Sequence, residues 1–185
     1  MGHVVVIGAG QAGSSCVAKL RNSGFEGKVT LIGAETAPPY QRPPLSKAYL
    51  LGDMTLERLF LRPESFYSDY NIDLMLGTHV DSIDPASQTI RVNGDDMAYD
   101  SLVLTTGSVP RRLPASIGGA LDGVHVVRDL ADVDAMAPRF TKGARVLIVG
   151  GGYIGLEAAS VASKLGLNVT LVEMGERILQ RVAAP

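Results

Sequence analysis

Two glycine-rich segments carry the clearest chemical signal in this sequence. GAGQAG (8–13) and GGGYIG (150–155) both match GxGxxG, and each lies between an apolar run and a stretch with helical spacing. In such a loop the first glycine permits a tight turn, the second lets a pyrophosphate approach the backbone, and the third lets helix and strand pack closely. The positions expected to contact a dinucleotide are Gly8, Gly10, Ala12, Gly13, Gly150, Gly152, Tyr153, Ile154 and Gly155.

A single GxGxxG is weak evidence, since glycine-rich turns also occur in ordinary α/β folds. Two copies, each with a strand before it and a helix after it, favour the binding interpretation. The helix that follows each loop offers free N–H groups and a favourable dipole to an anion. A P-loop is excluded, because Ser14 follows Gly13 where that motif requires lysine.

Acidic residues follow both loops at the spacing of a ribose ligand. Glu35 lies 22 residues after Gly13, and Glu173 lies 18 residues after Gly155. A carboxylate at this place accepts hydrogen bonds from ribose hydroxyls, so we expect Glu35 and its neighbour Ala34 to meet one nucleotide and Glu173 the other. Glu173 would also repel a 2′-phosphate, which favours NADH over NADPH. The alternative for each glutamate is a solvated strand end.

The elements around these loops predict an α/β protein. Each loop joins a strand to a helix, and a second strand follows, which implies a parallel sheet. Two Rossmann-like parallel-sheet units of three layers are therefore expected, with a small antiparallel insertion in the first unit. We predict strands at 3–7, 28–33, 72–76, 78–83, 88–92, 101–105, 144–149 and 168–173. Helices are predicted at 12–23, most of 48–70 with a break near Arg62-Pro63, 129–140 and 156–165, and a rigid proline-rich loop at 36–47.

Two nucleotide sites imply two nucleotides, and a flavin with a nicotinamide is the natural pair because hydride passes directly between them. We assign residues 1–111 to an FAD-binding domain and 112–185 to an NADH-binding domain. The crossing between them is Gly- and Pro-rich.

Composition excludes several other classes of protein. The net charge is −2, which gives no footprint for nucleic acid or an anionic membrane. No apolar run could span a bilayer and no signal peptide is evident, so we expect a soluble, cytoplasmic protein. Cys16 is the single cysteine, which excludes an internal disulfide and a CxxC pair. The three histidines are far apart and suggest no metal site.

Three segments resemble a known family. PPYQRPPLSKAYL (38–50), LTTG (104–107) and GGGYIGLE (150–157) are similar to FAD-dependent ferredoxin reductases of bacterial cytochrome P450 and ring-hydroxylating oxygenase systems, the putidaredoxin reductase type. These belong to the pyridine nucleotide-disulfide oxidoreductase superfamily. The RPPLSK stretch is the most specific, although apoptosis-inducing-factor-like proteins share it.

The resemblance implies roles for individual residues. Lys47 is expected beside the flavin ring, paired with Glu157 of the second loop's helix, where the pair would orient the nicotinamide. The alternatives are a surface salt bridge for Lys47 and a first-turn helix glutamate for Glu157. The further positions implied to meet the flavin nucleotide are Arg42, Val80, Thr106, Gly107 and Arg128. One departure is Ala34, where the family commonly has an acid, so Glu35 would hold the ribose alone.

The activity implied is that of an NADH:ferredoxin reductase. FAD would take a hydride from NADH and release single electrons to an iron–sulfur ferredoxin with a [2Fe-2S] cluster. The alternatives are a rubredoxin reductase, an NADH oxidase, a nitrite reductase flavin subunit, or a non-enzymatic apoptosis-inducing-factor-like protein. The family continues beyond the segment matched here. We therefore expect the 185-residue chain alone to be inactive, with Val169, Leu171 and Val172 poorly covered.

Overall fold

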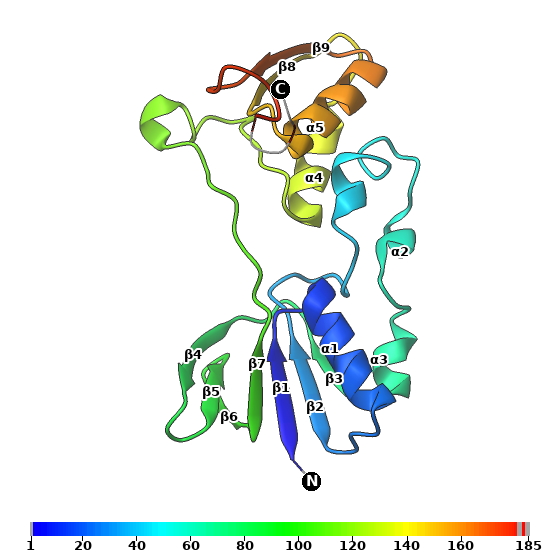
Figure 1. The fold of residues 1–185 in the computed structure, drawn as a ribbon, viewed down its shortest axis with the longest axis vertical. Coiled ribbons are helices and arrows are strands. Elements are labelled where there is room, and N and C mark those ends of the chain that lie inside the picture. The colour runs from blue at the N-terminus through cyan, green and yellow to red at the C-terminus, as the bar shows by residue number, and fades with distance from the viewer. Residues whose placement is uncertain (1, 181–182, 184–185) are drawn as a thin grey trace. The chain divides into compact units, whose positions relative to one another are not determined.

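The computed structural model describes residues 2–180 and 183, and the chain divides into two compact units. Unit 1 comprises Met1–Gln41 and Phe60–Ser108, and unit 2 comprises Arg42–Leu59 and Val109–Pro185. Each unit contains one glycine loop (Figure 1). The proline-rich segment after Gln41 therefore packs with the second loop's unit, although it follows the first loop in the sequence.

A four-stranded parallel sheet forms the centre of unit 1. Its order is β3 (Ile72–Met75), β2 (Lys28–Ile32), β1 (His3–Ile7) and β7 (Ser101–Leu104). β1 is paired on both sides, with Val5 opposite Thr30 in β2 and Leu102 in β7. A strand covered on both faces is apolar throughout, which is why Val4, Val5 and Val6 follow one another without alternation.

Two layers cover this sheet. α1 (Gln11–Asn22) and α3 (Ser65–Asp69) lie on one face (Figure 1), where Val17 and Tyr67 join the core. An antiparallel sheet of β4 (Val80–Asp84), β5 (Thr89–Val92) and β6 (Asp95–Ala98) packs on the other face through Ile90 and Val92. The Asn93–Gly94 turn joins β5 to β6 with both φ angles positive, as a two-residue hairpin requires.

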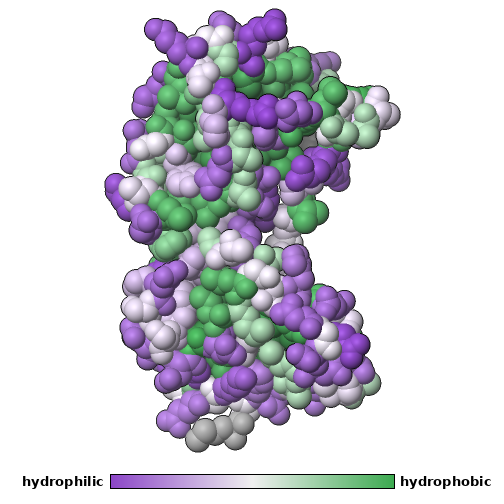
Figure 2. All heavy atoms as spheres, turned by 180° about the vertical axis from the view of Figure 1, so that it is seen from behind, coloured by the Kyte–Doolittle hydropathy of each residue, from purple (hydrophilic) through white to green (hydrophobic). Residues whose placement is uncertain are grey.

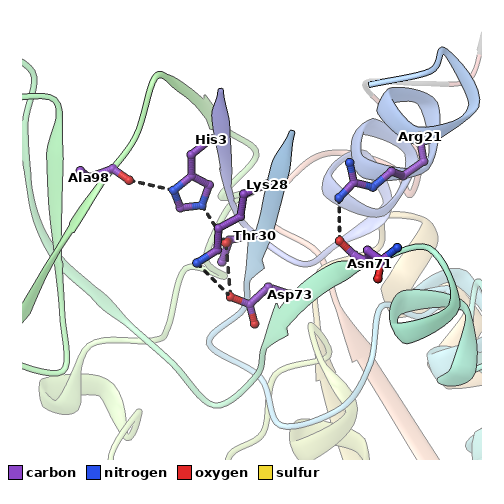
Figure 3. Close-up of polar contacts among 7 residues, drawn as sticks. All are labelled: His3, Arg21, Lys28, Thr30, Asn71, Asp73 and Ala98. Carbon is purple, nitrogen blue, oxygen red and sulfur yellow. Dashed lines mark hydrogen bonds and ion pairs between the residues drawn. The ribbon is translucent and has the colours of Figure 1, made fainter. Parts of the chain in front are cut away.

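A polar network ties together the strand ends remote from the glycine loop. His3 begins β1, and its ring bonds to the Ala98 carbonyl at 2.8 Å and to Thr30 Oγ1 at 2.9 Å (Figure 3). The Thr30 hydroxyl donates to Asp73 at 3.4 Å, and Lys28 lies 3.9 Å from the same carboxylate. The network links β1, β2, β3 and β6 at the end of the sheet opposite to the glycine loop.

Unit 2 contains a smaller parallel sheet. β8 (Arg145–Val149) pairs in register with β9 (Asn168–Val172), and α5 (Tyr153–Lys164) packs on them (Figure 1). Unit 2 also contains α4 (Leu130–Met136) and the 3-10 turns η2 (Ala115–Ile117) and η3 (Ala137–Arg139). Asp129 caps α4 through a reciprocal pair of hydrogen bonds with Asp132, as a capping box predicts. The buried positions of α4 are the predicted Leu130, Val133 and Met136.

The outer face of the small sheet exposes several apolar side chains. Leu147, Val149 and Val172 are exposed, whereas Val169 and Leu171, on the α5 side, are half-buried. Of the three side chains expected to be poorly covered, Val172 alone is exposed. Figure 2 shows green apolar surface interspersed with purple polar surface on the face that it draws. Among the described residues no helix is long and apolar enough to cross a membrane.

The fold class is confirmed, and two helix predictions need correction. Residues 48–70 were expected to be mostly helical, but the helices there are only α2 (Leu56–Leu59) and α3. The break expected near Pro63 is present, but Gly52, with φ of +79°, also interrupts the backbone, so turns fill much of the remainder. The helix after the second glycine loop was expected to begin at residue 156, but α5 begins at Tyr153 because Gly152 is already its N-cap.

Candidate functional site

The first glycine loop joins β1 to α1 and follows the predicted division of labour among its glycines. Gly8 has φ of +113°, and a Cβ there would overlap the Thr105 carbonyl oxygen. A Cβ at Gly13 would overlap the Gly8 carbonyl, so only glycine lets α1 approach β1 this closely. Gly10, the N-cap of α1, has open space where its Cβ would project. That space is where a pyrophosphate would approach the helix N-terminus.

Thr105 supports this loop and was not among the predicted site residues. Its main-chain N–H donates to the Ile7 carbonyl at 2.8 Å, and its hydroxyl donates to the Gly8 carbonyl at 2.8 Å. The predicted Thr106 and Gly107 follow as exposed residues, with Gly107 at φ of +72°. The LTTG motif pointed to this strand end, but only the pairing of β7 with β1 brings Thr105 to the loop.

Glu35, the predicted ribose ligand, follows β2, and its carboxylate accepts a hydrogen bond from the Tyr40 hydroxyl. Tyr40 is buried and belongs to the motif PPYQRPP, but no role was predicted for it. Ala34 is exposed beside Glu35. Val80 is half-buried at the start of β4 and packs against the core of Val5 and Ile90, which leaves its predicted backbone contact with adenine untested.

The second glycine loop has nearly the same backbone. Gly150 has φ of +112°, Gly152 is the N-cap of α5, and a Cβ at Gly155 would overlap the Gly150 carbonyl. Gly152, like Gly10, has nothing within 4 Å of its Cβ position. The predicted Tyr153 and Ile154 are exposed in the first turn of α5. A second pyrophosphate therefore fits here as the first fits unit 1.

Glu173 comes directly after β9 and bends back to the second loop. Its carboxylate accepts the Gly151 N–H at 2.6 Å and the Gly175 N–H at 2.8 Å. These two bonds hold a negative charge beside the loop. A nucleotide with an additional phosphate on its ribose would meet that charge.

Lys47 and Glu157 form the predicted ion pair, with Lys47 Nζ 2.9 Å from Glu157 Oε1. Both belong to unit 2: Lys47 follows the 3-10 turn η1 (Pro43–Ser46), and Glu157 lies two residues after the last loop glycine. The second carboxylate oxygen, Oε2, accepts the Ser46 hydroxyl at 2.6 Å. Burial alone would raise the pKa of Glu157, but the Ser46 and Lys47 hydrogen bonds and the Lys47 charge outweigh it and lower the pKa.

Arg42 and Arg128 are adjacent in unit 2. Arg42 donates to the Arg128 carbonyl at 2.7 Å, and the Arg128 main-chain N–H donates to Asp132 at 2.9 Å. The motif RPPLSK is thereby tied to the start of α4. The role of both arginines toward a flavin phosphate stays a prediction.

Comparison with known proteins decides the family. Residues 2–185 match the model of the pyridine nucleotide-disulphide oxidoreductase family. The chain belongs to this family. The resemblance inferred from PPYQRPPLSKAYL, LTTG and GGGYIGLE is thus confirmed.

Relatives within the family include ferredoxin and rubredoxin reductases. A ferredoxin–NAD(P)+ reductase from a Sphingomonas species is 46% identical over 97% of this chain and 44% of its own length. A rubredoxin–NAD+ reductase from Pseudomonas putida is 39% identical over 98% of this chain and 47% of its own length. The structure of putidaredoxin reductase in covalent complex with putidaredoxin matches all of this chain and 45% of that chain, with TM-score 0.95 and 41% identity. The chain thus spans less than half the length of these relatives.

Proposed function

We propose that this family member binds FAD in unit 1 and NADH in unit 2 and serves as a reductase of an iron–sulfur ferredoxin. The observation that carries the proposal is the pair of equivalent glycine loops, one in each unit, each open where a pyrophosphate approaches. Bound FAD would accept a hydride, which is a proton with two electrons, and would then pass the two electrons on one at a time. The assignment of residues 1–111 to an FAD-binding domain and 112–185 to an NADH-binding domain is also part of this proposal.

The residues of unit 1 would hold the flavin nucleotide. The N–H groups at the start of α1 receive the pyrophosphate, and Gly10 leaves it room. Glu35 accepts hydrogen bonds from the ribose while the Tyr40 hydroxyl keeps its carboxylate in place. Val80, Thr106 and Gly107 carry over from the family resemblance as further contacts. The resemblance also implies Arg42, Lys47 and Arg128 as residues that meet the flavin nucleotide.

The residues of unit 2 would hold NADH and select it over NADPH. Gly150, Gly152 and Gly155 shape the second loop, and Tyr153 and Ile154 stand exposed above it. The Glu173 carboxylate, held at the second loop by the Gly151 and Gly175 N–H groups, would repel a 2′-phosphate on the ribose. Glu157 lies just past the loop on α5, and Lys47, which follows η1, pairs with it, so that the ion pair would orient the nicotinamide end of the dinucleotide.

The partner in this proposal is a [2Fe-2S] ferredoxin that supplies a cytochrome P450 or a ring-hydroxylating oxygenase in the cytoplasm. Support comes from the matched structure of a reductase bound to putidaredoxin. Rubredoxin is the second candidate acceptor, because a rubredoxin–NAD+ reductase is 39% identical to this chain. No contact among the described residues favours an NADH oxidase, a nitrite reductase flavin subunit or a non-enzymatic protein of the apoptosis-inducing-factor type.

An anaerobic titration of the full-length protein tests this proposal. NADH is added while the flavin absorbance is followed, and a [2Fe-2S] ferredoxin, a rubredoxin or dioxygen is then supplied as the acceptor. We expect NADH to bleach the flavin and the ferredoxin to restore its colour fastest. A protein without bound flavin, or one reoxidised fastest by rubredoxin or dioxygen, contradicts the proposal.

Lys47→Ala tests the role of the ion pair in the same protein. If Lys47 acts in the transition state, the substitution slows flavin reduction more than it weakens NADH binding. Stopped-flow traces at several NADH concentrations separate the two effects. An unchanged maximal rate of reduction would leave Lys47 as a surface contact.

A further inference from the structure

Ser46 makes a contact that the Lys47–Glu157 pair does not explain. Its hydroxyl lies 2.6 Å from Glu157 Oε2, while Lys47 Nζ lies 2.9 Å from Oε1. Two neighbouring residues of one segment therefore bind the two oxygens of a single carboxylate. A hydrogen bond to an ionised acceptor is shorter and about twice as strong as one between neutral groups, in line with the 2.6 Å separation.

The surroundings make Ser46 a rigid donor. It ends the 3-10 turn η1, whose first two residues are prolines, and it is only 5% exposed. The Lys47 main-chain N–H donates to the Pro44 carbonyl at 3.0 Å, which fixes the backbone next to Ser46. The Lys47 side chain is half-exposed and long, and its ammonium also lies 3.5 Å from the Pro43 carbonyl. Of the two groups, the serine is therefore better placed to set the orientation of the carboxylate.

We propose that Ser46 is a positioning residue that holds the Glu157 carboxylate in one orientation opposite Lys47. The inference rests on the proposed NADH reaction for its functional meaning. Without the serine, one carboxylate oxygen would lose its fixed donor and the Glu157 side chain could rotate away from Lys47. The pair would then be present in only part of the molecules, and NADH would meet a less ordered site.

Ser46 should also influence the pH at which the Lys47–Glu157 ion pair breaks. Lys47 is the charged group that acts on the Glu157 carboxylate. On α5, Lys164 is directed to Asp53 at 3.8 Å, and on α4 the Asp132 carboxylate accepts the N–H groups of Arg128 and Asp129. Ser46 contributes to the lowered pKa of Glu157. Its loss should raise that pKa, so the pair would break at a higher pH as acid is added.

The test measures the carboxylate itself and does not depend on activity. The full chain is labelled with ¹³C at glutamate side-chain carboxyls, the Glu157 signal is assigned with Glu157→Gln, and its titration is compared in wild type and Ser46→Ala. We expect the midpoint to move to higher pH in Ser46→Ala and to return toward wild type in Ser46→Thr. Ser163→Ala, an exposed serine on the same helix, should leave it unchanged.

Stopped-flow reduction of the flavin by NADH supplies the second readout. The acid limb of the rate profile should move to higher pH in Ser46→Ala, whereas a merely structural loss would lower the rate by the same factor at every pH. If Ser46→Ala does not fold, Ser46→Cys keeps nearly the same volume with a weaker donor and should move the midpoint in the same direction. A Glu157 midpoint that is the same in these variants and in wild type overturns the inference. A flavin that NADH does not reduce overturns the proposed function instead.

Discussion

The glycine loops of units 1 and 2 have almost the same backbone. Gly8 and Gly150 have φ of +113° and +112°, and each loop leads into a helix of 12 residues. In both, the third glycine lies against the carbonyl of the first, and the space beside the second is open. The strand, the GxGxxG loop and the helix that follows therefore have the same short-range geometry in both units.

The surroundings of the two loops differ. β1 has a strand on each side and buried valines on both faces, whereas β8, in the described part of the chain, pairs with β9 alone and exposes Leu147 and Val149. Thr105 of the segment after β7 supports the Gly8 carbonyl, and a Cβ at Gly150 has nothing within 4 Å. The same loop is thus enclosed in unit 1 and open in unit 2, so substitutions at matched positions should have unequal effects.

The largest expected difference is between Gly8→Ala and Gly150→Ala. A backbone φ in so sparsely populated a region costs a non-glycine residue about 1–3 kcal/mol, and Gly150→Ala meets only this penalty. Gly8→Ala also drives a Cβ into the Thr105 carbonyl, and overpacking adds about 1–3 kcal/mol. Urea denaturation followed by circular dichroism measures both. Gly24→Ala in unit 1, with positive φ but open space, is the control and should resemble Gly150→Ala. Equal losses at Gly8 and Gly150 would remove the distinction between the units.

Coenzyme preference comes next in size. Like charges brought together in a binding site cost several kcal/mol, so the full-length protein should favour NADH over NADPH in kcat/KM by about a hundredfold, or about 2.7 kcal/mol. Glu173→Ala removes the charge beside the second loop and should narrow that ratio. Glu35→Ala changes the corresponding acid in unit 1 and should leave the ratio as it was. Equal use of both coenzymes by the unsubstituted protein would show that Glu173 does not meet the ribose.

Gly10→Ala and Gly152→Ala should separate the two nucleotides. Neither Cβ meets another atom within 4 Å, so both proteins should fold normally. Each methyl group would occupy the approach of a pyrophosphate, and we expect about a tenfold loss of affinity, or about 1.4 kcal/mol. Flavin content after dialysis should fall in Gly10→Ala alone, and the NADH dissociation constant should rise in Gly152→Ala alone. A loss of flavin from Gly152→Ala would reverse the proposed assignment of the units.

The smallest effect is expected for Tyr40→Phe. It removes the hydrogen bond that holds Glu35 and should weaken FAD retention by about 1 kcal/mol. Tyr49→Phe is the control, because the Tyr49 hydroxyl donates instead to Asp134 at 2.8 Å in unit 2. Fluorescence of released flavin gives the affinity in each. Similar losses from the two substitutions would show that Tyr40 has no particular role at the ribose.

Sequence alone determined the local structure around each loop. Local structure depends on residues close together in the chain, where φ limits, capping and periodicity act directly. This holds for the strands, the helices α1 and α5, the cap Asp129 and the Asn93–Gly94 turn. The Lys47–Glu157 pair was expected from the family resemblance, and the structure brings the two side chains together. The extent of helix expected in 48–70 was wrong because turns around Gly52 replace it, although the break expected near Pro63 is present.

Tertiary structure decided the supporting contacts, because these join residues far apart in sequence. Thr105 reaches Gly8 only through the pairing of β7 with β1, and Ser46 reaches Glu157 only because residues 42–59 pack in unit 2. Nothing in the type or spacing of either residue marks it, since hydroxyl side chains take partners from whatever the fold places beside them. The two glycine loops differ in burial for the same reason. Their sequences give them matching backbones, but the neighbouring strands decide how much of each loop is buried.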